Sequence, residues 1–250
     1  MEINGLGDQR PVLAGYHDES WKDGNEQSRI MPTRSPTGRR RPFIGLLGAA
    51  SLALCPLSGQ AHPHAWIDVR STVVLSPDGE FTAIKEQWLF DELYSAAVMD
   101  GMASDSPSGH ATAREFAAMA IENLRPYDYF TKITVDGKAI RLDKASEFAG
   151  AMRGSQLLLT FTASLARPVN PAAHQVAYAI YDPSYFIQMM HRPGEPPAIE
   201  GRAGRACRLR VAAPNPTPED IARAYALDRG AQAEEGFGDL FAEKVHIQCE

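Results

Sequence analysis

The sequence contains only 3 cysteines in 250 residues and has no excess of basic residues. Its 25 Lys and Arg are outnumbered by 31 Asp and Glu, a net charge of −6, so it lacks the basic surface that nucleic-acid-binding proteins use. Its one strongly apolar run, residues 43–54, is too short to span a membrane. The sequence also lacks a P-loop, a dinucleotide fingerprint, a nucleophile elbow, a CxxC pair and an HExxH motif. These absences argue against a nucleic-acid partner and exclude a polytopic membrane protein.

The apolar run has the flanks of a secretory signal peptide. Three arginines at 39–41 precede it, and the small residues Gly59 and Ala61 suit a cut after Ala61. We therefore expect residues 31–61 to be a cleaved signal peptide and the protein to be exported to the periplasm. Residues 1–30 are polar and without periodicity, which favours a mis-assigned start or a disordered extension.

The predicted mature chain, residues 62–250, has 189 residues and a net charge of −7. Cys55 would be removed with the predicted signal peptide. The residues around it resemble a lipobox, so lipidation at Cys55 is an alternative to ordinary secretion. The two remaining cysteines, Cys207 and Cys249, predict one disulfide in an oxidising compartment. A thiolate metal pair is the alternative, but the two residues lack CxxC spacing.

Alternation with period two predicts that the mature chain consists mainly of strands joined in hairpins. Asp136-Gly137 marks a tight hairpin turn, and Thr112 and Thr217 are expected to cap helices. We expect one compact α+β domain, a sandwich-like antiparallel sheet with inserted helices, and a mobile loop at 193–204. The predicted strands are 66–75, 81–90, 157–165, 176–181 and 244–249, with a hairpin around 133–142, and the predicted helices are 92–102, 112–124 and 217–227.

The new N-terminus is the sharpest candidate for chemistry. Cleavage after Ala61 leaves a free α-amine on His62, and this amine with the imidazoles of His62 and His64 forms a nitrogen set suited to Cu(II) or Ni(II). Pro63 has no N–H to lose, which excludes the copper and nickel motif that needs a deprotonated second amide. Asp68 shares the strand face of His64 and is expected to ligate or to orient an imidazole. The alternative is a polar lead-in without function.

Three further acids are weaker candidates for metal ligands. Asp91 and Glu92 stand where a strand becomes a helix, so the alternative for them is an N-cap and a first-turn acid. Asp182 precedes a proline, and its alternative is a turn former. The remaining histidines of the mature chain lack ligand spacing and are expected to be structural or on the surface: His110, His174, His191 and His246.

Three ordered motifs stand out in the predicted mature chain, and two cysteines follow them. The motifs are His62-Pro63-His64-x-Trp66-Ile67-Asp68, Trp88-x-Phe90-Asp91-Glu92-x-Tyr94-Ser95 and Tyr181-Asp182-Pro183-x-Tyr185-Phe186. Together they resemble the exported proteins grouped as DUF1007. The resemblance implies a periplasmic component of an uncharacterised transport system, commonly encoded beside nickel- or cobalt-type permeases. It therefore implies an inner-membrane metal permease as partner. After Ile187 this chain has Gln188 where many relatives have an acid.

We therefore expect a periplasmic accessory protein of a transition-metal transport system, which binds nickel, cobalt, zinc or copper or docks to the permease. We expect no enzymatic activity. Two alternatives stay open: a structural or interaction module of a transporter assembly without a metal of its own, and a hydrolase or N-terminal-histidine copper enzyme.

Overall fold

The computed structural model describes residues 63–201, 207–227, 233–234 and 236–250. The predicted extension (1–30), the predicted signal peptide (31–61) and His62 lie outside the described residues. Within the described ranges, no helix is both long and apolar enough to cross a membrane.

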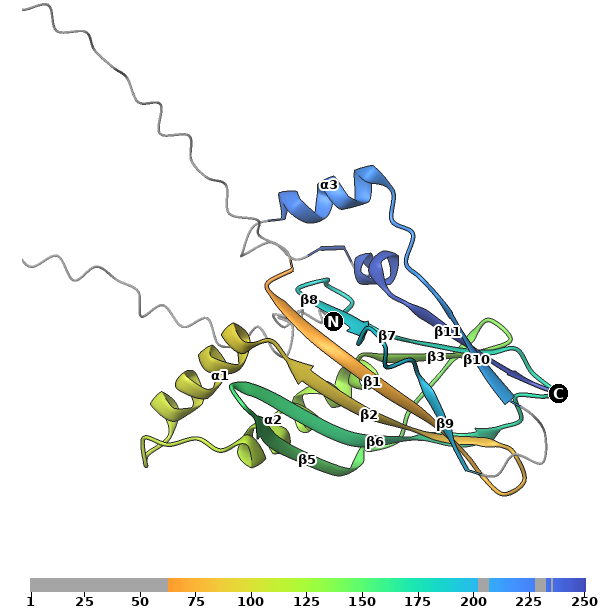
Figure 1. The fold of residues 1–250 in the computed structure, drawn as a ribbon, viewed down its shortest axis with the longest axis horizontal. Helices are drawn as coiled ribbons and strands as arrows, with labels where there is room; N and C mark the ends of the chain where they lie inside the picture. Colours follow the sequence, from red (N-terminus) through yellow and green to blue (C-terminus); the bar gives the residue numbers. More distant parts are fainter. Residues whose placement is uncertain (1–62, 202–206, 228–232, 235) are drawn as a thin grey trace, which may run out of the picture. The chain divides into compact units, whose positions relative to one another are not determined.

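Two sheets form the frame of the described domain (Figure 1). Sheet A has the strand order β5-β6-β2-β1-β8, and β9 also pairs with β1. Sheet B has the order β10-β11-β7-β3-β4. The strands of sheet A are β1 (Ala65–Leu75), β2 (Phe81–Phe90), β5 (Ser146–Arg153), β6 (Gln156–Val169), β8 (Ile187–His191) and β9 (Ala198–Glu200). Those of sheet B are β3 (Thr131–Val135), β4 (Lys138–Ile140), β7 (Val176–Ile180), β10 (Cys207–Ala212) and β11 (Lys244–Cys249).

The strands form where the sequence alternates. In β1, Ile67 and Val69 point inward, whereas Trp66 and Arg70 are exposed. β1 and β2 pair as the predicted antiparallel hairpin. β3 and β4 pair around Asp136-Gly137, and both turn residues have positive φ, which glycine and aspartate tolerate better than most residues.

Capping residues determine where the helices begin. The α-helices are α1 (Glu92–Asp105), α2 (Ala113–Leu124) and α3 (Pro218–Ala226), with 3-10 segments η1 (Arg125–Phe130) and η2 (Phe237–Phe241). Thr112 and Thr217 each form a complete capping box, as their sequence signals predict. The start of α2 packs directly on β5, because a Cβ at Gly150 would lie 1.8 Å from the Ala113 carbonyl oxygen.

One hydrophobic core lies between the two sheets and α2. It contains Ile67 and Trp88 of sheet A, Ile133 and Val245 of sheet B, and Phe116 of α2. The predicted α+β class is therefore confirmed, with two mostly antiparallel sheets.

The structure corrects the predicted topology at three places. β8 and β9 both pair with β1 in parallel, across more than a hundred residues of sequence. The described part of the predicted mobile loop 193–204 contains β9, and residues 202–204 lie outside the described residues. β5 was not predicted because its residues are almost all exposed, so no inward-facing pattern marks it. Local periodicity carries no information on such long-range partners.

The predicted disulfide between Cys207 and Cys249 is present, with an S–S distance of 1.99 Å. The two residues lie directly opposite each other in the antiparallel pair of β10 and β11. Both α3 and η2 lie in the chain segment between these cysteines.

Candidate functional site

The three sequence motifs meet at the end of sheet A where β1 begins. The backbone N–H of His64 donates to the carbonyl oxygen of Phe186 at 2.8 Å, and the two rings lie 4.6 Å apart. The backbone N–H of Trp66 donates to Asp91 Oδ2 at 2.9 Å, and the Asp91 N–H donates to the Trp66 carbonyl. The motifs are therefore one structural unit, held together largely by backbone hydrogen bonds.

Asp91 has two structural tasks at this junction. Its Oδ1 accepts the Tyr94 N–H and caps α1, while its Oδ2 holds the first residues of β1. Glu92 follows in the first helical turn and is exposed. Asp91 and Glu92 therefore occupy the N-cap and first-turn positions that were predicted as the alternative to metal binding.

Asp182 is buried and accepts hydrogen bonds from the residues that follow it. Its Oδ1 takes the N–H and the hydroxyl of Ser184, and its Oδ2 takes the Ile187 N–H at 3.0 Å. Burial raises the pKa of the Asp182 carboxyl. Burial also raises the pKa of the Tyr94 hydroxyl, with smaller contributions from Asp91 and Asp182, so these three side chains share one neighbourhood.

Asp68 lies on the outer face of sheet A and forms an ion pair with Arg192 at 3.4 Å. Within the described ranges, no group of three or more His, Cys, Asp or Glu side chains is placed to hold a metal ion. His62, the first predicted ligand, lies outside those ranges. The metal site therefore stays a prediction. Of its predicted ligands, the structure describes His64 and the four acids Asp68, Asp91, Glu92 and Asp182.

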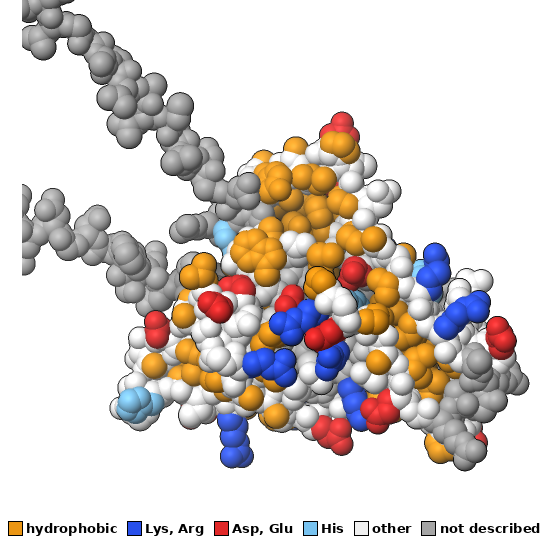
Figure 2. Space-filling view, in the orientation of Figure 1, with side chains coloured by type: hydrophobic (Ala, Val, Ile, Leu, Met, Phe, Trp, Pro, Cys, Tyr) orange, Lys and Arg blue, Asp and Glu red, His pale blue; other side chains and the backbone are white. Residues whose placement is uncertain are grey.

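An apolar groove of about 470 Å³ lies between β8 and α3, next to the motif junction. Trp66 and Tyr225 line it with about half of their surfaces exposed, 52% and 53%. Figure 2 shows the hydrophobic side chains gathered over α3 and the neighbouring strand ends. Tyr185 and Phe241 stack in the lining with ring centroids 3.9 Å apart. Sequence patterns did not reveal the groove, because its residues come from distant segments.

Two carboxylates accept hydrogen bonds from backbone N–H groups of β8 beside this groove. Asp182 accepts the N–H of Ile187, and Glu243 accepts the N–H of His191 at 2.7 Å. Each carboxylate occupies a backbone donor that would otherwise be available to an added strand. This arrangement disfavours pairing of another chain with β8.

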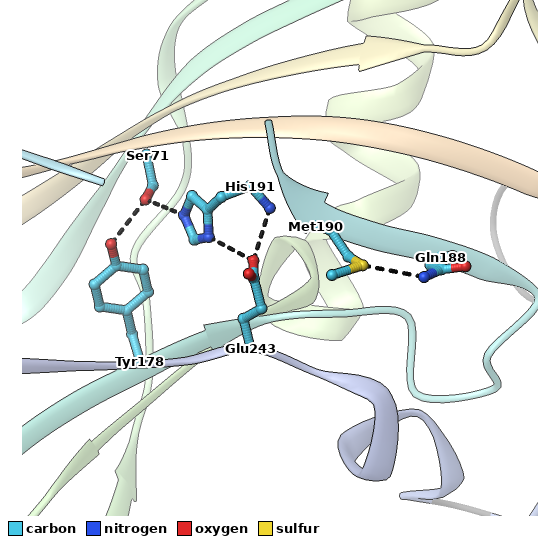
Figure 3. Close-up of polar contacts among 6 residues, drawn as sticks. All are labelled: Ser71, Tyr178, Gln188, Met190, His191 and Glu243. Carbon is cyan, nitrogen blue, oxygen red and sulfur yellow. Dashed lines mark hydrogen bonds and ion pairs between the residues drawn. The ribbon is translucent and has the colours of Figure 1, made fainter. Parts of the chain in front are cut away.

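A chain of hydrogen bonds runs from β7 through β1 and β8 to Glu243 (Figure 3). Tyr178 Oη and Ser71 Oγ lie 2.7 Å apart, Ser71 Oγ and His191 Nε2 lie 2.7 Å apart, and His191 Nδ1 lies 2.8 Å from Glu243 Oε2. The order Ser–His–acid is that of a hydrolase triad. Ser71 is fully buried, however, so no substrate carbonyl reaches its hydroxyl. The chain links the two sheets instead.

Glu86 is a second buried acid between the sheets. Trp88 Nε1 donates to its Oε2 at 2.7 Å, and Thr131 Oγ1 donates to its Oε1 at 2.6 Å. Burial raises the pKa of Glu86 to about 7, although both hydrogen bonds oppose that shift. Strand alternation marks Glu86 and Ser71 as inward-facing, and that signal was available in the sequence.

The model of the family "Protein of unknown function (DUF1007)" matches residues 47–249. The chain belongs to the DUF1007 family. A protein of Haemophilus influenzae described as uncharacterized is 26% identical over 194 residues, which cover 76% of this chain and 92% of that protein. The resemblance inferred from the three motifs is confirmed, and in this DUF1007 chain those motifs build the end of sheet A beside the apolar groove.

Proposed function

We propose that this DUF1007 domain is an exported accessory module that docks a partner protein through the groove between β8 and α3. The observation that carries the proposal is the groove itself, because two aromatic side chains of its lining, Trp66 and Tyr225, are about half exposed. Clustered exposed apolar side chains of this kind mark interaction sites in folded proteins. The predicted partner is an inner-membrane metal permease, and the predicted compartment is the periplasm.

Site-specific photo-crosslinking tests the docking proposal. A photoreactive phenylalanine analogue replaces Tyr225 in the groove or, as a control, Phe148 on β5, whose side chain is 41% exposed. We expect the groove position to crosslink to the permease in intact cells and the control position not to do so. Equal crosslinking from both positions, or none from position 225, would contradict the proposal.

A metal-binding N-terminus is the second candidate function. His64 lies at the same end of sheet A as Asp91 and Asp182, which supports the sequence-based prediction of a site there. Export would create the α-amine of His62, so we propose that the site forms only after cleavage. Histidine and amine ligands would hold nickel, cobalt, zinc or copper beside the groove.

Calorimetry with each of the four divalent metals tests this second candidate. We expect the processed protein to bind at least tenfold more tightly than the precursor, a difference of about 1.4 kcal/mol. Affinity should fall as the pH drops below about 6.5, because protonated imidazoles do not ligate. His64→Ala should weaken binding, whereas His110→Ala, an exposed control, should not. An absence of binding below about 100 µM would remove the metal role.

A further inference from the structure

Strand β5 forms the second border of sheet A, at the opposite end of the strand order from β8 (Figure 1). Within the described ranges it pairs only with β6, so half of its backbone N–H and C=O groups point away from the sheet. Seven of its eight residues are exposed, and the exception is Gly150, which lies against the start of α2. This backbone edge is therefore open to a further strand.

The features that protect edge strands from pairing are sparse on β5. On the opposite border, carboxylates already accept the backbone N–H groups of Ile187 and His191. Residues 148–152 of β5 instead contain no charge and no proline. Phe148 and Met152 in this stretch are 41% and 47% exposed. The centre of β5 therefore combines an open backbone edge with exposed apolar side chains.

The sequence of this edge is complementary to itself in the antiparallel direction. Pairing two copies about Gly150 joins small with small, large apolar with large apolar, and acid with base. A bulge at the start of β5 precedes Ala149, so the regular part of the strand contains the centre of this register. The residue pairs are Ala149–Ala151, Phe148–Met152 and Glu147–Arg153, each formed twice.

The two charged ends of β5 lie on the outer face of sheet A. Glu147 is exposed there, and its Oε2 accepts from the Thr162 hydroxyl at 3.0 Å. Arg153 is exposed and lines a shallow hollow of the same face with Asp68. Asp68 pairs with Arg192, and Arg153 has no ion-pair partner among the described residues. An acid and an unpaired base are thus available for contacts across the edge.

We infer that β5 pairs with β5 of a second copy of this chain in an antiparallel, two-fold symmetric dimer. The occupant is a second copy because the register matches β5 to itself and because a two-fold axis at Gly150 forms each contact twice. Ala113 and Ala117 of α2 lie against Gly150, so the pairing also brings the two α2 helices together at the axis. The edge is separate from the groove, so the inference does not rest on the proposed docking function.

Sedimentation velocity of the purified chain at concentrations from about 1 to 200 µM tests the inference. We expect a concentration-dependent equilibrium between monomer and dimer. Arg153→Glu and Glu147→Arg each place like charges opposite each other at two symmetric positions, so each should weaken dimerisation about tenfold. The variant with both substitutions should restore the dimer, because its exchanged charges are again complementary.

Arg210→Glu is the matched control, because it makes the same change of charge at an exposed position of β10 in sheet B. It should leave the dimer unchanged, and circular dichroism should show that every variant folds. A photoreactive phenylalanine analogue at position 148 should crosslink to a second copy of the chain rather than to the permease. A chain that is monomeric at about 200 µM, or a double variant that dimerises no better than the single ones, would overturn the inference.

Discussion

Glu86 is the buried residue whose protonation has the clearest consequence. Its folded pKa of about 7 lies above the ordinary value of 4.5. Between these values the unfolded chain has released a proton that the folded protein still holds. The free energy of unfolding therefore falls as the pH rises from about 4.5 to about 7 and stays lower above that range. The loss amounts to about 3 kcal/mol.

Glu86→Gln should remove this loss. A glutamine oxygen can accept the Trp88 N–H, and its amide can donate to Thr131 Oγ1, whose hydroxyl also lies 3.0 Å from the Tyr129 carbonyl oxygen. We expect the variant to match the wild type at pH 4.5 and to exceed it by about 2–3 kcal/mol at pH 8. Urea denaturation at several pH values measures the difference.

Glu86→Ala serves as the control, because it leaves the Trp88 N–H without an acceptor and opens a cavity. That variant should be less stable than the wild type at every pH. A glutamine variant that loses as much stability at pH 8 as at pH 4.5 would contradict the assignment of a neutral Glu86.

At the scale of elements, Glu243 ties the edge strand β8 to the start of β11. Burial alone would raise the pKa of Glu243, but the side-chain and backbone N–H groups of His191 outweigh burial and hold it below the ordinary value. Its contribution to stability is therefore complete above about pH 4.5 and is lost as the pH falls through the folded pKa. This pH dependence has the opposite sign to that of Glu86.

Glu243→Gln keeps the shape of the side chain and one oxygen for the two His191 donors. We expect it to lower the free energy of unfolding by about 1–2 kcal/mol at pH 7, because hydrogen bonds to a charged acceptor are stronger. The difference from the wild type should shrink below about pH 4. Chemical denaturation at pH 3.5 and pH 7 measures it, and a difference that grows in acid would contradict a Glu243 carboxylate stabilised by these hydrogen bonds.

At the scale of the whole molecule, the disulfide connects stability to the groove. Cys207 and Cys249 are separated by 42 residues, and the closed segment contains α3 and η2, which supply Tyr225 and Phe241 to the groove. Loop-closure entropy assigns the bond about 4 kcal/mol. The bond therefore restrains one wall of the groove as well as the C-terminal strand.

Replacing both cysteines with serine should lower the free energy of unfolding by about 3–4 kcal/mol. It should also weaken binding in the groove, because the segment that carries α3 is held less tightly. Thermal denaturation and photo-crosslinking from position 225 measure the two effects. Reduction of the wild type should reproduce both effects. Undiminished crosslinking after reduction would show that the pairing of β10 with β11 alone restrains this segment.

The sequence alone determined the local features of this protein. Period-two alternation located β1 and β2 and the inward face of Trp88, and the signals at Thr112, Thr217 and Asp136-Gly137 identified two helix starts and a hairpin turn. Because the predicted mature chain has two cysteines, the sequence also predicted their disulfide, which the structure contains. The strands, helix starts and turn depend on residues that are close in the sequence, and the disulfide follows from the number of cysteines. These features can therefore be recognised without knowledge of the tertiary structure.

Tertiary structure alone decided which distant residues meet. Ser71 and His191 are 120 residues apart and His191 and Glu243 are 52 apart, yet they form one hydrogen-bonded chain. The groove likewise combines Trp66 with Tyr225. The parallel pairing of β8 with β1 brings His191 beside Ser71, and it depends on how the sheets bury their apolar faces together. Local periodicity specifies which face of a strand is buried but not which distant strand lies beside it.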